Sequence, residues 1–443
     1  MYLNDNPNVC ACGKVHVCAQ EQMIVGKNAI AALPSELRRR ACQKVFILAD
    51  VHTYAAAGAR VEEVLGEAHI PFSKYVYDRS PEPDEAAVGA AVMHFDRSCD
   101  VVLAVGSGVI GDISKILAGV SGAVYMIVAT APSMDGYASA TSSMTRNGLK
   151  VSIPSACASV IIGDINVLKN APMEMLISGL GDMLAKYISI AEWRISHVVT
   201  GEYYCETVAE SIRQSLAACV QNAKGLLARD EAAVEAVFKG LVMAGAAMSY
   251  AGTSRPASGV EHYFSHLWDM RGVAFDAPVS THGIQCAVAT LIAARLYEYL
   301  QTITPERARG LAYAAQFDRD AWFSELSDFL GDGARDMIAL EQKERKYCTH
   351  KHAERLEIIL EHWDELIGIM QAEIPNADTL EALLDQIGCP KTPQAWGIFP
   401  DSLPVTFKAT KDIRDKYVLS RLAFDLGVLE EMAALCGGEE YRV

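Results

Sequence analysis

The chain has 443 residues, a formal net charge of −16 and a hydrophobic fraction of 51%. It is too long for one small hydrophobic core, so we expect two or three domains. The excess of acidic residues argues against a nucleic-acid partner or an anionic membrane surface, because binding a phosphate backbone requires a basic face.

The start of the chain and its apolar stretches indicate neither secretion nor membrane insertion. The first residues have no basic start followed by a long apolar core, so we expect no secretory signal. The longest apolar stretch, residues 123–130, is far shorter than the about 20 residues that cross a bilayer, and it predicts a buried strand.

Twelve cysteines are scattered along the chain without a dense framework, which indicates reduced thiols and a cytoplasmic location. Cys10, Cys12, His16 and Cys18 lie close enough in sequence to raise a structural zinc site. Their C-x-C-x3-H-x-C spacing does not match the usual paired Cys-x2-Cys knuckles, and a capping strand or loop is the alternative.

The first third of the chain alternates short apolar runs with helical stretches. Predicted strands cover residues 44–50, 72–77, 100–105, 124–129 and 159–162. This alternation predicts a parallel sheet covered by helices on both faces, which is a nucleotide-binding architecture. Residues 201–228, 231–251 and 352–372 carry helical periodicity instead.

We therefore predict an α/β dinucleotide-binding domain over residues 1–170 and an all-helical metal- and substrate-binding domain over residues 171–443. Asn170 as a helix N-cap with Pro172 in the first turn marks the boundary between them.

A glycine-rich turn follows the predicted strand that ends at Val105. Gly106, Gly108 and Gly111 let backbone N–H groups approach a pyrophosphate, and the start of the next helix favours its negative charge. The turn does not follow the first strand, where a G-x-G-x-x-G fingerprint usually lies. Asp50, at the end of an earlier strand, is placed to accept hydrogen bonds from a ribose 2′-hydroxyl, or simply to form a turn.

A second polar segment follows the strand that ends at Ala129. Hydroxyl side chains from Thr130 to Ser143 provide a polar rim at the carboxyl edge of the sheet, where open α/β sheets bind ligands. Thr and Ser would contact phosphate or nicotinamide, and Asp135 would accept substrate hydroxyls. A Ser/Thr-rich loop without a ligand is the alternative.

The metal candidates lie further along the chain. His262 and His266 are four residues apart, so both rings would project from one face of a helix that Ser258 and Glu261 begin with a capping box. His282 follows, and a buried carboxylate signal lies upstream at Asp182.

These segments together resemble the iron-containing alcohol dehydrogenase, glycerol dehydrogenase and dehydroquinate synthase superfamily, and within it the sn-glycerol-1-phosphate dehydrogenase family. The resemblance rests on residues 106–112, 130–136, 179–186, 193–194 and 255–266. It covers roughly residues 10–295, and residues 255–266 favour the glycerol-phosphate branch. Ser107 stands where the family commonly has a glycine.

The resemblance implies a site in an interdomain cleft, with roles that map residue by residue. The metal ligands would be Asp182, His262 and His282, and Asp135, Asp182 and His266 would contact the substrate and take part in catalysis. Cofactor contacts would come from Asp50, Gly108, Val109, Ile110, Gly111, Asp112, Thr130, Ala131, Pro132, Ser133 and Ser139.

The implied reaction is NAD(P)H-dependent, metal-assisted reduction of dihydroxyacetone phosphate to sn-glycerol 1-phosphate. The Asp50 position favours NAD over NADP, and the ligands suit zinc, with nickel or iron as alternatives. Lys150, Lys186, Arg194 and Arg255 are available for the phosphate. A homodimer is the common choice for soluble enzymes.

Other activities use the same parts. A polyol dehydrogenase acting on an unphosphorylated substrate would lack only the cationic pocket. A lyase of the dehydroquinate synthase type would use NAD transiently, and a non-catalytic metal-binding protein would need none of the cofactor segments.

Overall fold

The computed structural model describes residues 9–17, 20–146, 149–398 and 400–438. The chain divides into two compact units. Unit 1 comprises Met1–Met183 and Glu206–Ser254, and unit 2 comprises Leu184–Cys205 and Arg255–Val443.

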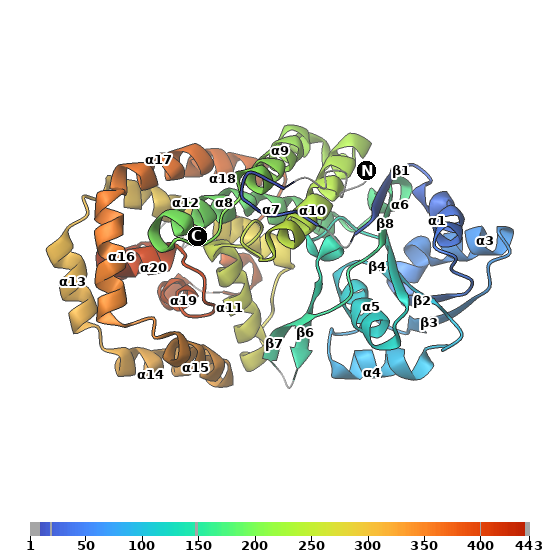
Figure 1. The fold of residues 1–443 in the computed structure, drawn as a ribbon, viewed down its shortest axis with the longest axis horizontal. Coiled ribbons are helices and arrows are strands. Elements are labelled where there is room, and N and C mark those ends of the chain that lie inside the picture. The colour runs from blue at the N-terminus through green and yellow to red at the C-terminus, as the bar shows by residue number, and fades with distance from the viewer. Residues whose placement is uncertain (1–8, 18–19, 147–148, 399, 439–443) are drawn as a thin grey trace. The chain divides into compact units, whose positions relative to one another are not determined.

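Unit 1 is built on a six-stranded sheet with the order β1-β8-β5-β4-β2-β3, in which every neighbouring pair is parallel (Figure 1). Its strands are β1 (Gln22–Gly26), β2 (Val45–Asp50), β3 (Phe72–Tyr77), β4 (Val101–Gly106), β5 (Val124–Ala129) and β8 (Val160–Asp164). The predicted parallel α/β architecture is confirmed.

The central strands are buried on both faces, as helix-covered parallel strands must be. Alternate residues of β2 and β4 join a core with α1 (Leu33–Arg39) and α3 (Ala59–Glu67). The intervening residues, such as Leu48 and Ala104, are equally buried on the opposite face. Continuous runs of β-branched and apolar residues therefore identified these strands in the sequence.

Three strands were missed in the sequence. β1 is short and partly exposed, and it pairs with β8 at the sheet edge. β6 (Thr141–Arg146), which is mostly polar and resembles a loop, and β7 (Leu149–Pro154), which alternates apolar and polar residues, form a separate antiparallel hairpin. Each of these three strands is stabilised by pairing with another strand, and the residue pattern of the strand alone does not reveal that partner.

The remaining helices of unit 1 are α2 (Val51–Thr53), α4 (Glu85–His94), α5 (Gly108–Ser121), α6 (Ile165–Leu168), α7 (Met173–Leu184), α9 (Glu206–Asn222) and α10 (Glu231–Ala251). α10 is long and apolar enough to cross a membrane by composition, yet 61% of its apolar window is buried and it packs against α9. These properties are those of a core helix.

Unit 2 contains helices and no strand within its described residues. They are α8 (Lys186–Thr200), α11 (Val260–Phe275), α12 (His282–Thr302), α13 (Arg307–Gln316), α14 (Arg319–Leu330), α15 (Ala334–Glu344), α16 (Thr349–Glu361), α17 (Trp363–Glu373), α18 (Ala377–Gln386), α19 (Leu403–Thr410), α20 (Leu419–Leu426) and α21 (Leu429–Cys436). One apolar core joins α8, α11 and α12 to the helices after residue 300.

Two predicted helix starts are wrong in detail. α7 begins at Met173, and the Asn170 side chain donates to the carbonyl of Asn166 instead of capping it. α11 has Gly259 as its N-cap, and only the glutamate half of the predicted capping box forms, since Glu261 accepts from the Gly259 N–H. Ser258 lies one residue too early to cap.

The predicted boundary after residue 170 coincides with the end of the strands: β8 and α6 precede it, and only helices follow among the described residues. The compact units group the chain differently, because α9 and α10 belong with the sheet.

Candidate active site

The strand order of unit 1 creates a switch point between β2 and β4. From β2 the chain passes outward to β3 and then returns to the other side of β2 as β4. Leu48 pairs with Ala104, so Asp50 and Gly106 end their strands at the same level. Ligands of open α/β sheets bind outside the carboxyl ends of strands at such a point.

The glycine-rich turn places the start of α5 at this edge. Ser107 is the N-cap, and the helix runs for 14 residues from Gly108. The first-turn N–H groups of Gly108, Val109 and Ile110 have no intrahelical acceptor, so they can bind an anion. A Cβ on Gly106 would lie 2.5 Å from that of Ile110, so this glycine permits the tight strand-to-helix turn.

Asp50 performs the structural role that was the alternative in the sequence. Its Oδ1 accepts the backbone N–H groups of His52 and Thr53, each at 2.8 Å, and so caps α2. The described residues supply no hydrogen bond to its Oδ2. The capping role leaves one carboxylate oxygen for a ribose.

Several predicted cofactor side chains bond within unit 1. Lys115 donates to Asp112 Oδ1 at 3.0 Å, and Ser143 N–H donates to Asp112 Oδ2 at 3.1 Å. Ser107 and Ser133 hydroxyls lie 2.6 Å apart. Ser139 bonds Thr141. Asp112 therefore positions the β6 strand.

The loop after β5, residues 130–135, is held by α7. A Cβ on Gly179 would lie 1.8 Å from the Pro132 carbonyl oxygen, so only glycine lets the helix approach this closely. Ser178 Oγ donates to the Ser133 carbonyl at 2.9 Å. Thr130 and Ala131 in the same loop are buried.

This docking brings the two predicted carboxylates of unit 1 together. The Asp135 N–H donates to Asp182 Oδ2 at 2.9 Å, and one carboxylate oxygen of each side chain lies within 4.8 Å of the other. Asp182 is fully buried. A cation offsets the cost of burying a carboxylate, so this position suits a metal ligand.

The three predicted histidines lie close together in unit 2. The ring centroids of His262 and His282 are 5.1 Å apart, and His266 lies 6.4 Å from His262 and 6.1 Å from His282. His262 and His266 are on α11, and His282 begins α12. The predicted helical presentation of the first two is confirmed.

His262 is oriented by the residue before it. Its Nδ1 lies 2.8 Å from Glu261 Oε1, a fully buried carboxylate that also accepts the Gly259 N–H. With Nδ1–H donating to the carboxylate, Nε2 carries the lone pair. Metal-binding histidines typically have such a carboxylate partner, which fixes the tautomer and raises the basicity of the ligand nitrogen.

His282 and a cysteine complete this cluster. Ser265 Oγ lies 3.1 Å from His282 Nδ1, and Cys286 Sγ lies 3.7 Å from His282 Nε2. Ligand atoms of His262, His282 and Cys286 all lie within 4.8 Å of one another. Burial, the largest single cause, raises the pKa of the Cys286 thiol, whereas the electrostatic interactions and hydrogen bonds with His262 and His282 together lower it, and the net shift of the pKa is downward.

His266 is flanked by cations. Burial is the largest cause that holds its pKa well below the usual range, followed by the charges of His282, His262, Arg414 and Lys416. Lys416 donates to the Ser258 carbonyl at 2.9 Å. Arg414 is exposed, and its guanidinium has no ion pair or hydrogen bond within the described part of the chain.

The cations named from the sequence have structural partners instead. Arg255 is fully buried and paired with Glu202 at 2.6 Å, and Arg194 pairs with Glu373 at 2.6 Å. Lys186, also fully buried, donates to the Ala257 carbonyl. The side chain of Lys150 lies outside the described part. Sequence periodicity does not distinguish a cation that bonds elsewhere in the protein from one that binds a ligand.

The donor chemistry fits a divalent metal ion. The imidazoles of unit 2, one of them fixed by a carboxylate, and the buried aspartate of unit 1 are each ligand types that zinc, nickel and iron(II) accept. The sequence indicated Glu261 only as part of a capping box, and it did not single out Cys286, Arg414 or Lys416. The four-residue spacing of His282 and Cys286 on one helix was the available signal.

Comparison with known proteins gives concordant results. A family model described as iron-containing alcohol dehydrogenase matches residues 24–172. The chain is 29% identical over 384 residues to a glycerol-1-phosphate dehydrogenase (NAD(P)+) of Halalkalibacterium halodurans, covering 86% of each. It is 32% identical to the enzymes of that name from Geobacillus stearothermophilus and Pyrococcus furiosus, covering 65% and 62% of this chain and 73% and 78% of theirs.

Solved structures share the fold at low identity. A 1,3-propanediol oxidoreductase superposes with a TM-score of 0.62 at 15% identity, covering 95% of this chain and all of the other. An iron-containing alcohol dehydrogenase from Thermococcus thioreducens gives 0.61 at 14% identity, covering 96% and 99%.

Proposed function

Since this chain belongs to the glycerol-1-phosphate dehydrogenase family, we propose that it reduces dihydroxyacetone phosphate to sn-glycerol 1-phosphate with NAD(P)H. The observation that carries the chemistry is the His262 imidazole, whose Nδ1 lies 2.8 Å from a buried carboxylate and which has a ligand nitrogen within 4.8 Å of ligand atoms of His282 and Cys286. This is the arrangement of a ligand for a divalent ion.

The reaction transfers a hydride from the nicotinamide to the C2 carbonyl carbon and a proton to its oxygen, leaving NAD(P)+ and the alcohol. The cofactor would lie at the β2–β4 switch point. The N–H groups of Gly108 to Ile110 would bind the pyrophosphate, and Gly111 and Asp112 of the same helix and the loop Thr130–Ser133 would complete the cofactor site. Asp50 Oδ2 would accept the ribose hydroxyls, and Ser139 would face the nicotinamide end.

Asp182, His262 and His282 would hold the metal ion, with zinc as the favoured occupant and nickel or iron as alternatives. A divalent ion there would act as a Lewis acid toward the substrate carbonyl. Asp135 would orient a substrate hydroxyl. His266, held neutral by burial and neighbouring positive charge, would hydrogen-bond the substrate and pass a proton from solvent.

Arg414 and Lys416 would bind the phosphate. Both act electrostatically on His266, and the Arg414 guanidinium has no other partner among the described side chains. A dianion next to them would relieve their mutual repulsion, and in a chain of net charge −16 such local cations are needed to attract it.

We further propose a homodimer in the cytoplasm. Closed two-fold dimers are the commonest oligomers of soluble enzymes, and thiols scattered along the chain suit a reducing compartment.

The decisive experiment compares dihydroxyacetone phosphate with dihydroxyacetone in an NADH oxidation assay. We expect kcat/KM to be at least about a hundredfold higher for the phosphorylated substrate, equivalent to roughly 3 kcal/mol of phosphate binding expressed in the transition state. Arg414→Gln should lower kcat/KM for dihydroxyacetone phosphate and leave the unphosphorylated substrate unaffected.

Product stereochemistry gives an independent check. The product should resist an enzyme specific for sn-glycerol 3-phosphate, and complete consumption would refute the assignment. Equal rates with dihydroxyacetone would instead support a polyol dehydrogenase. Failure to accumulate NAD+ in net turnover would support a lyase that uses NAD transiently.

A further inference from the structure

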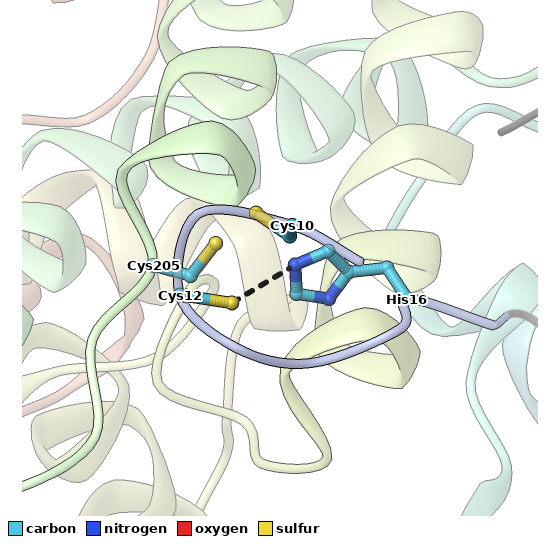
Figure 2. Close-up of side chains that lie close together, drawn as sticks. All are labelled: Cys10, Cys12, His16 and Cys205. Carbon is cyan, nitrogen blue, oxygen red and sulfur yellow. Dashed lines mark hydrogen bonds between the residues drawn. The ribbon is translucent and has the colours of Figure 1, made fainter. Parts of the chain in front are cut away.

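A cluster of sulfur and nitrogen ligands lies apart from the histidines of the active site. Figure 2 shows Cys10, Cys12 and His16 from the N-terminal segment together with Cys205. One ligand atom from each of the four lies within 4.8 Å of all the others. Cys18, the fourth member of the cluster predicted from the sequence, lies outside the described residues.

The backbone is shaped to present the two thiols of the segment. The Gly13 N–H donates to the Cys10 carbonyl at 2.8 Å, and the Cys10 N–H donates to the Lys14 carbonyl at 2.9 Å, closing a turn. Gly13 has a φ of +84°, a left-handed conformation that favours glycine. The turn brings Cys12 Sγ to 3.4 Å from His16 Nε2.

The tautomer of His16 is fixed for ligation. Its Nδ1 lies 3.0 Å from the Tyr250 carbonyl oxygen on α10, an acceptor, so Nδ1 carries the proton. Nε2 therefore carries the lone pair, and the dashed line in Figure 2 joins this nitrogen to Cys12 Sγ. A ring N–H donated to a backbone carbonyl is the common second contact of a metal-binding histidine.

Cys205 directly precedes Glu206, the first residue of α9, so the start of this helix fixes the position of the Cys205 backbone. Cys10 Sγ bonds the Thr207 hydroxyl on the same turn at 3.3 Å. The fourth ligand is thus supplied from a distant part of the sequence, as is common when a metal ties a terminal segment to a folded domain.

Hydrophobic packing does not explain why the segment lies here. Val9, Val15 and Val17 are 67%, 48% and 64% exposed. Two of the four candidate ligands hold the segment against its neighbours, because Cys10 bonds Thr207 of α9 and His16 bonds the Tyr250 carbonyl of α10.

We propose that Cys10, Cys12, His16 and Cys205 form a structural zinc site that is separate from the catalytic metal. Three thiolates and one imidazole are a closed tetrahedral donor set of the Cys3His type. With Zn–S near 2.3 Å and Zn–N near 2.1 Å, tetrahedral geometry puts sulfur and nitrogen about 3.6 Å apart, close to the separation of Cys12 and His16. The proposal does not depend on the function of the protein.

Cobalt substitution distinguishes this site from the active site. Full-length protein is stripped of metal, reconstituted with Co²⁺ and examined for the thiolate-to-cobalt charge-transfer band. The parent protein should show the band, and Cys10→Ser/Cys12→Ser should lose it. Cys286→Ser, which removes the thiol beside His282, and Cys42→Ser, outside both clusters, should retain it.

Absence of the band in the parent, its survival in the double variant, or its loss in Cys286→Ser would each overturn the proposal. X-ray absorption of the zinc-loaded parent supplies a test that needs no variant: zinc–sulfur scattering near 2.3 Å is expected. An environment of nitrogen and oxygen alone, or a Cys10–Cys12 disulfide in anaerobically purified protein, would also overturn it.

Discussion

Glu261→Gln isolates the effect of one negative charge on the proposed catalytic metal. The glutamate Oε1 accepts both the His262 Nδ1–H and the Gly259 N–H, each at 2.8 Å, whereas its buried Oε2 has no hydrogen-bond partner in the described structure. A glutamine carbonyl oxygen can keep both bonds, and its amide group can occupy the position of Oε2. The side chain is isosteric, so the helix start should be preserved.

The expected loss comes from the weaker polarisation of His262. A carboxylate acceptor makes a stronger hydrogen bond than an amide and raises the basicity of Nε2. Removing such an outer contact typically lowers metal affinity by about 10- to 100-fold, which is about 1.4–2.7 kcal/mol. The change in melting temperature should be small by comparison.

Manganese titration followed by electron paramagnetic resonance measures this loss directly. The free ion gives the signal, and Mn²⁺ prefers oxygen and imidazole ligands to thiolates, so the Cys10 cluster should not compete. Glu341→Gln is the matched control, because Glu341 is also buried with one unpartnered oxygen but bonds the backbone of Tyr347. It should leave the affinity unchanged.

Unchanged Mn²⁺ affinity in Glu261→Gln would refute the argument that this carboxylate tunes a metal ligand. A large fall in melting temperature, with the affinity of the folded fraction intact, would show that Glu261 serves only the start of α11.

Three further changes test other parts of the site. Gly179→Ala places a Cβ 1.8 Å from the Pro132 carbonyl oxygen and should destabilise the fold by about 1–3 kcal/mol or more. The control Gly66→Ala on α3, where the added Cβ meets open space, should be neutral or stabilise the fold by up to about 1 kcal/mol. Equal melting temperatures of the two variants would contradict the close approach of α7 to Pro132. Asp50→Asn keeps an acceptor for the α2 cap but removes the charge, so the ratio of kcat/KM for NADH to kcat/KM for NADPH should fall by about tenfold. Equal kcat/KM values for the two cofactors in the parent protein would show that Asp50 does not contact the ribose. Burial and then the charge of Arg255 lower the pKa of Lys416 to about 7. Because the ammonium loses its proton as pH increases through 7, KM for dihydroxyacetone phosphate should rise over this range. Lys416→Arg, which stays charged, should flatten that rise, and an unaltered pH profile of KM in this variant would show that Lys416 does not bind the phosphate.

The sequence by itself determined the elements whose signals are local. Continuous apolar runs identified β2, β4 and β5 because a strand buried on both faces is apolar at every position. The glycines after β4 indicated a turn into a helix, and the four-residue spacing of His262 and His266 placed both rings on one helical face. Motif resemblance then assigned the family.

Tertiary structure decided what each charged or polar group does, because a side chain's role depends on partners that come from elsewhere in the chain. The guanidinium of Arg255 is chemically suited to bind a phosphate, yet it is buried and paired with Glu202. Arg414 lies beyond the recognisable motifs and becomes a candidate only through its nearness to His266. Cys205 has no cysteine or histidine close to it in sequence, and it lies beside Cys10, Cys12 and His16 because it directly precedes α9. A four-ligand site is defined by distances in space, and residue spacing along the chain does not encode those distances.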